Sequence, residues 1–288
     1  MAQPRQLFVA ADGPRVDRDG EAQLCEESRR IIDKVDWPCE VKTLFREQNL
    51  GCREAVGGAI SWFFENVEEG IILEDDCLPN ESFFTFCAEL LERYRHDHRV
   101  MCITGDNFQN GQKSGSASYY FSIYNHIWGW ATWRRAWNHF DHNLSKWETL
   151  RRTFFLNKLM PRESVAYWTR VFDSVRNREV NSWAYIWTFS CWARGGLTAT
   201  PNVNLISNIG FDSRATHTVD HASRLANPPI SELTFPQTHP LRVRRDKKAD
   251  SFVERNVFGI QFTESYAVRA RRKLNRIIQK INKLACRS

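Results

Sequence analysis

The sequence lacks any uninterrupted run of about 18 apolar residues, the length that a membrane-spanning helix requires. Its first residues, MAQPRQLFVAADGPR, contain no basic segment followed by a long apolar stretch, so we expect no signal peptide. Its eight cysteines are scattered without a C-x-x-C pair, which argues against a zinc cluster and a small disulfide scaffold. These absences predict a soluble, cytoplasmic protein with free thiols.

Acidic residues are missing from residues 265–288, which carry eight lysines and arginines. The whole chain has a formal net charge of +6, so the remainder carries about −2. Because the body of the protein is not basic, we expect no nucleic-acid partner.

The rest of the composition is that of a folded domain, with 42% hydrophobic residues, 11 Trp and 19 Phe in 288 residues. Strand-like and helix-like patterns alternate through the first part of the chain. The pattern predicts an α/β fold with a mostly parallel central sheet flanked by helices, and one domain with an elaborated second half. The expected strands are 6–13, 39–45, 70–73 and 100–105; the helices between them are 21–35, 52–67 and 81–97.

Beyond residue 115 the pattern is looser. It predicts a strand over 117–125, helices over 132–140, 164–175 and 182–196, and extended segments over 197–210.

Three acids, Glu74, Asp75 and Asp76, directly follow the apolar run GIIL. A continuous apolar run is typical of a strand covered on both faces, and open α/β sheets bind ligands at the carboxyl ends of such strands. Adjacent carboxylates repel one another unless a cation neutralises them, and Mg²⁺ and Mn²⁺ prefer oxygen ligands. The alternative is a solvated acidic loop end.

The stretch GIILEDDCLPNESFFTFCAELLERYRHDHRVMCITGDNFQNG, followed by WGWATWRRAW, resembles the nucleotide-sugar glycosyltransferases of the Rossmann-like GT-A fold. It is most similar to the N-acetylglucosaminyltransferase I type and to bacterial relatives in surface-polysaccharide clusters. The resemblance runs over roughly residues 5–220. It implies a GT-A domain over 1–235, with a nucleotide- and metal-binding half (1–110) and an acceptor-side half (111–235), and then a C-terminal extension (236–288).

The resemblance assigns roles in donor binding. Asp76 would contact a Mn²⁺ or Mg²⁺ ion, while Glu74 and Asp75 would face the ribose, the donor sugar or metal-bound water, with Asp75 among the catalytic residues. Asp12 would lie under the uracil, or else form a turn before Gly-Pro. Arg53 would lie near the nucleotide, or else be a surface arginine on a helix.

Four other positions follow from the same resemblance or from residue type. Trp130 is the preferred sugar contact in IWGWATW, although aromatics at such spacing are more often core. Asp106 and Asn107 could bind donor hydroxyls, or form an Asx-turn. His217 is a candidate metal or diphosphate contact, or a solvated loop histidine.

An inverting transferase needs a general base near the acceptor hydroxyl. In the similar enzymes an Asp follows a Trp at the start of a helix, but here Ala184 follows Trp183. Three explanations stay open: a deliberate substitution, a natural loss of activity, or another acid acting as base. We favour the first, since the rest of the pattern is kept. The nearest acids in sequence are Asp173, Glu179 and Asp212.

Residues 265–286 predict a basic amphipathic helix with one apolar stripe. Such a helix could bind an anionic membrane surface, at the inner face of the plasma membrane, or pack on the body or on another subunit.

We therefore expect a metal-dependent, inverting glycosyltransferase that moves a sugar from a UDP-sugar, with UDP-N-acetylglucosamine as first guess, to a saccharide or lipid-linked saccharide. The alternative is a catalytically silent module that binds a sugar nucleotide or glycan.

Overall fold

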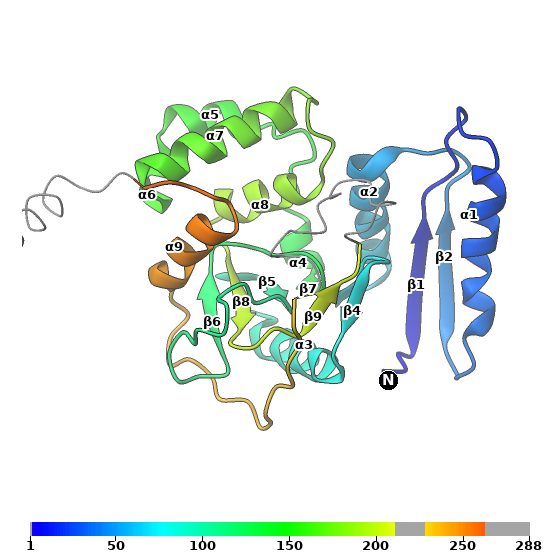
Figure 1. Ribbon diagram of the computed structural model, residues 1–288, viewed down its shortest axis with the longest axis horizontal. Helices are drawn as coiled ribbons and strands as arrows, with labels where there is room; N and C mark the ends of the chain where they lie inside the picture. Colours follow the sequence, from blue (N-terminus) through cyan, green and yellow to red (C-terminus); the bar gives the residue numbers. More distant parts are fainter. Residues whose placement is uncertain (1, 211–227, 263–288) are drawn as a thin grey trace, which may run out of the picture.

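The computed structural model describes residues 2–210 and 228–262 and has a mixed α/β fold (Figure 1). At one side, strands β1 (Gln6–Ala11) and β2 (Glu40–Phe45) pair in parallel as a separate two-stranded sheet. Helix α1 (Glu21–Arg29) and a short 3₁₀ turn (Arg30–Lys34) connect them. Phe8 of β1 packs edge-on against Phe63, with ring centroids 5.0 Å apart, and thereby attaches this unit to the body.

The central sheet has five strands in the order β3-β7-β5-β8-β6. Their bounds are Glu69–Ile72 (β3), Val100–Thr104 (β5), Tyr119–Ser122 (β6), Trp130–Trp133 (β7) and Leu197–Pro201 (β8). β3, β5 and β8 point in one direction, but β7 is antiparallel to both β3 and β5, and β6 is antiparallel to β8.

The expectation of one mostly parallel sheet is therefore wrong in two respects. The sheet is mixed, with β5 and β8 as its one directly paired parallel neighbours in the described chain. β3, expected at the centre, is an edge strand that is only partly buried. The antiparallel β7, which was not expected as a strand, separates β3 from β5.

A third, two-stranded sheet joins β4 (Cys77–Pro79) to β9 (Ile206–Asn208). β4 follows the three acids directly, so the acidic segment is a turn between two strands. The Ile209 N–H donates to the Asp76 carbonyl at 2.9 Å and extends this pairing to the turn itself.

Helices α2 (Gly51–Asn66) and α3 (Glu81–Tyr94) confirm two of the expected helices. In α3, the apolar residues recur every three or four positions and form one buried face. The Asn80 side chain accepts the Ser82 N–H at 2.8 Å and caps its first turn.

The second half supplies a helical layer, seen above the central sheet in Figure 1. It consists of α4 (Arg134–Trp137), α5 (Trp147–Arg152), α6 (Phe155–Leu159), α7 (Arg162–Arg176) and α8 (Ala184–Ala193). Its buried tryptophans form a single apolar core with α2. α7 and α8 confirm two predicted helices, whereas α5 and α6 were not expected.

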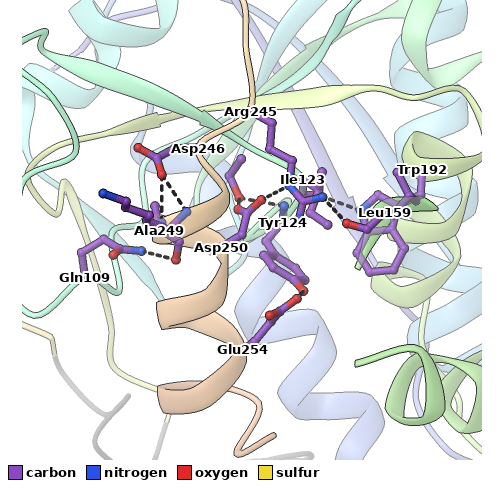
Figure 2. Close-up of polar contacts among 12 residues, drawn as sticks. Gln109, Ile123, Tyr124, Leu159, Trp192, Arg245, Asp246, Ala249, Asp250 and Glu254 are labelled. Carbon is purple, nitrogen blue, oxygen red and sulfur yellow. Dashed lines mark hydrogen bonds and ion pairs between the residues drawn. The ribbon is translucent and has the colours of Figure 1, made fainter. Parts of the chain in front are cut away.

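Helix α9 (Lys247–Asn256) was not predicted, and it joins the supposed C-terminal extension to the body. The Asp246 N–H donates to the Phe121 carbonyl at 2.7 Å, and Val253 lies in the tryptophan-rich core. Figure 2 shows the polar contacts that hold this helix, with Asp250 and Glu254 both buried. The described residues 236–262 thus belong to the same body as the preceding chain, and position 235 does not separate two folded units.

The predicted basic helix 265–286 lies outside the described residues. Within the described residues, no helix combines the length and apolar character needed to cross a membrane.

Candidate functional site

The three adjacent acids have different environments in the turn after β3. Asp75 is exposed and Asp76 is partly buried. The Glu74 carboxylate points inward, and its Oε1 atom is buried without a hydrogen-bond partner in the described chain. The Cys77 N–H donates to the Glu74 carbonyl at 3.1 Å and closes the turn.

A second acid, Asp106, follows β5 and is fully buried. Its Oδ2 atom accepts the Trp128 N–H at 3.1 Å, and its own N–H donates to Thr104 Oγ1 at 3.1 Å. Its Oδ1 atom, like Glu74 Oε1, is buried and has no partner within the part of the chain that the structure describes.

Strand register brings these two acids to the same edge of the sheet. Trp130 pairs with Ile72 of β3 on one side and with Thr104 of β5 on the other. Glu74 and Asp106 each lie two residues beyond those partners. A methyl group on Gly129 would meet Ile206 at 2.5 Å, so the chain beside the acids has no room for a side chain there.

The electrostatics confirm that the two carboxyl groups interact. Burial raises the pKa of Asp106 to about 8, and the neighbouring Glu74 charge adds to the shift. Burial likewise raises the pKa of Glu74 to about 7, helped by the charges of Asp76 and Asp75 and opposed by a hydrogen bond from the Trp183 side chain. Near neutral pH, the pair therefore retains protons and can both donate and accept hydrogen bonds.

Trp183 is thus a neighbour of Glu74. The sequence analysis considered it only as the residue that precedes Ala184. It immediately precedes α8, and Ala184 is the first residue of that helix. The partly buried Ala184 has no ionisable group to offer, as the sequence indicated.

Trp130 lies among the buried tryptophans. It is fully buried and stacks on Trp183 with ring centroids 5.7 Å apart, beside Trp137 and Trp187. The ring packs as core, which is the alternative interpretation, and the sugar contact at Trp130 stays a prediction.

Asp12 and Asn107 have structural partners. The Asp12 carboxylate accepts the N–H groups of Gly13, Leu50 and Gly51 at 2.9–3.1 Å and caps the start of α2. Asn107 Oδ1 accepts the Gln109 N–H at 2.8 Å, which is the Asx-turn given as the alternative. Their nucleotide and sugar contacts stay predictions.

Arg53 is buried, which excludes the surface interpretation. Its guanidinium donates to the carbonyls of Val175, at 3.0 Å, and His142, at 2.5 Å. These contacts tie α2 to the end of α7, so the guanidinium serves the fold, and its proximity to a nucleotide stays a prediction.

The expected metal contacts are Asp76 and His217, and His217 lies outside the described residues. Within the described chain, no cluster of three or more His, Cys, Asp or Glu side chains could hold a metal. Asp76 Oδ1 accepts the Cys77 thiol at 3.3 Å.

The three other acids named as possible bases have different environments. Asp173 is bound to Arg151 at 2.8 Å and to the Trp147 indole at 2.9 Å, whereas Glu179 is exposed. Asp212 lies outside the described residues.

In comparisons with known proteins, no family model matches the chain, and no curated protein matches it in sequence.

Proposed function

We propose that the protein is a glycosyltransferase that binds a nucleotide-sugar donor at the Glu74–Asp106 edge of the central sheet. The observation that carries the proposal is the pair of buried carboxyl oxygens, Glu74 Oε1 and Asp106 Oδ1, without partners in the described chain. Leaving a buried polar atom unpaired costs about 1–3 kcal/mol, so such atoms are typical of a site completed by a ligand. Sugar hydroxyls can donate to and accept from both groups.

The exposed Asp75 and the partly buried Asp76 directly follow Glu74 in the turn. Asp76 is the carboxylate that would hold Mn²⁺ or Mg²⁺. These ions need only one or two protein carboxylates, because water and substrate phosphates complete their coordination. A bound ion there would offset the negative charge of a departing diphosphate.

A second candidate is a binding module that does not turn over its ligand. It is favoured by Ala184, since the start of α8 has no carboxylate to accept the proton of an acceptor hydroxyl.

Thermal-shift measurements with UDP-N-acetylglucosamine, UDP-glucose and UDP, each with and without Mn²⁺, test donor binding. A ligand that binds the folded state must raise its apparent stability. We expect the sugar nucleotides to raise the melting temperature more than UDP, and Asp106→Asn or Glu74→Gln to reduce that difference. Asp76→Asn should remove the Mn²⁺-dependent part of the shift.

Absence of a shift with every nucleotide sugar would exclude both the transferase and a module that binds sugar nucleotides. Release of UDP in the presence of saccharide acceptors then separates the enzyme from the binding module, because only the enzyme produces UDP at a rate above that of spontaneous hydrolysis.

A further inference from the structure

A hollow of about 590 Å³ lies between α2 and the segment from α4 to His142. Its wall on α2 includes Glu54, Gly58 and Glu65, and the opposite wall includes Asn138, Phe140 and His142. This volume is in the range of small-molecule sites. The Glu74–Asp106 pair is not part of its lining.

Two consecutive glycines, Gly57 and Gly58, lie on the α2 side of this α2–α4 groove. A methyl group on Gly57 would lie 3.4 Å from the Phe140 ring, so the helix backbone approaches the ring closely. Phe140 in turn stacks on Trp137, with ring centroids 4.3 Å apart and planes inclined by 12°. The Trp137 indole N–H is already bound to Ser61 Oγ at 3.0 Å, so the stack offers no further donor from that ring.

Two of the charged groups around the groove are paired, whereas Glu65 is exposed and forms no ion pair within the described residues. Glu54 lies 3.0 Å from His142 Nε2, and Arg134 forms an ion pair with Glu68. Paired charges give no strong attraction for an anion or a cation, but their oxygens and N–H groups can still bind hydroxyls. A flat ring beside such groups suits a neutral, hydroxyl-rich molecule with an apolar face.

The groove adjoins the carboxylate site through a single residue. A methyl group on Gly57 would lie 3.9 Å from Trp183 Cβ, and the Trp183 side chain is among the groups that influence the pKa of Glu74. We propose that the α2–α4 groove is a binding site for a neutral saccharide, which is the acceptor chain. The acceptor role rests on the proposed function, whereas saccharide binding in the groove does not.

Replacing Gly58 tests this assignment, because the position lines the groove and is not part of the core. A methyl group there would meet only the flexible end of Arg46, at 3.4 Å. Gly58→Trp therefore adds a bulky ring at the α2 wall of the groove, and Gly58→Ala is the matched control. Binding of chitotetraose and maltotetraose is measured by ligand-observed NMR, and the UDP-N-acetylglucosamine thermal shift is measured on the same samples.

We expect the parent protein and Gly58→Ala to bind at least one of the two oligosaccharides, and Gly58→Trp to bind it about tenfold more weakly or worse. The donor-induced thermal shift should be equal in all three proteins, which also shows that Gly58→Trp is folded. Equal saccharide binding by the two variants, or no binding by the parent, would overturn the proposal.

Spermidine is the cationic probe. If it binds and Glu65→Gln abolishes its binding, while neither oligosaccharide binds, the groove is a cation site and the proposal fails. If saccharides bind but no nucleotide sugar shifts the melting temperature, the proposed function fails and the groove remains a glycan site. A donor shift without saccharide binding removes the groove proposal alone.

Discussion

Asp106 Oδ2 accepts the Trp128 backbone N–H at 3.1 Å, which ties the end of β5 to the chain that enters β7. The other oxygen of the same carboxyl group, Oδ1, has no partner in the described chain. One oxygen thus maintains the fold of the site, and the second is the oxygen that we propose to bind the donor. A substitution of Asp106 can therefore change stability through Oδ2 and ligand binding through Oδ1, and the two effects are measured separately.

The Asp106 carboxyl group should make stability decrease with rising pH. Its pKa is raised from 3.8 to about 8, so between these values the folded state keeps a proton that the unfolded state has lost. The free energy of unfolding should therefore fall across that window by at most about 1.4 kcal/mol per pH unit. Asp106→Asn should flatten the decrease and be more stable than the parent at pH 9. Urea unfolding at pH 5, 7 and 9 measures this.

Asp36→Asn is the control for that experiment, because this carboxylate is exposed and does not contribute to the raised pKa of Asp106 or of Glu74, so its loss should leave the profile parallel to that of the parent. Some pH dependence should survive in Asp106→Asn through Glu74, whose pKa is about 7. A profile for Asp106→Asn identical to that of the parent would contradict the burial of this carboxyl group in a protonated form.

The Asp12 side chain should matter for stability as a helix cap. Its carboxylate accepts three backbone N–H groups at the start of α2. Asp12→Ala leaves these donors without a protein acceptor and should lower the free energy of unfolding by about 1–2 kcal/mol. Asp12→Asn retains an acceptor oxygen and should lose less. Chemical denaturation compares the two, and equal stability of Asp12→Ala and the parent would show that the cap is dispensable.

The pattern of the sequence could predict α3, since its apolar face repeats along a single helix and its cap, Asn80, is adjacent in sequence. It could not predict the neighbours of β3. Pairing with β7 depends on contacts between distant segments, and a short apolar run is compatible with either orientation. Helix α9 was not predicted because it is mostly polar. Its buried acids are explained by their tertiary partners.

The candidate site shows the same limit. Three consecutive acids are equivalent in sequence, but the turn exposes Asp75 and directs Glu74 toward Trp183, a residue from a distant helix start. Trp130 and Trp128 were likewise indistinguishable by type and spacing. Strand pairing on both sides of Trp130 decides that its ring is core.

Arg245 should be essential for docking α9. Its guanidinium forms an ion pair with the buried Asp250, whose other oxygen accepts the Ser122 hydroxyl at 2.5 Å (Figure 2). The nearby Glu254, also buried, accepts the Tyr124 hydroxyl at 2.8 Å. Arg245→Met leaves the buried Asp250 without its cation and should cost about 3–5 kcal/mol in the free energy of unfolding.

Lys247→Met, an exposed position on the same helix, is the matched control and should change stability little. The double variant Arg245→Met, Asp250→Asn should recover part of the loss, because it removes one unpaired charge. If the double variant is no more stable than Arg245→Met, charge is not the cause of the loss.

Ala184→Asp should convert the protein into a faster transferase. Position 184 begins α8 beside Trp183, so the new carboxylate lies at a helix N-terminus that favours its charged form and close to the Glu74 site. A positioned general base contributes about 10²–10⁴-fold to the rate, and we expect UDP release with an acceptor to rise by a factor in this range.

Ala184→Asn, with the same shape and no basic oxygen, is the control. The donor-induced thermal shift should be the same in both variants, because the substitution adds a proton acceptor without removing a donor contact. If Ala184→Asp releases UDP no faster than Ala184→Asn while both bind the donor, position 184 is not the base position and the binding module becomes the better account.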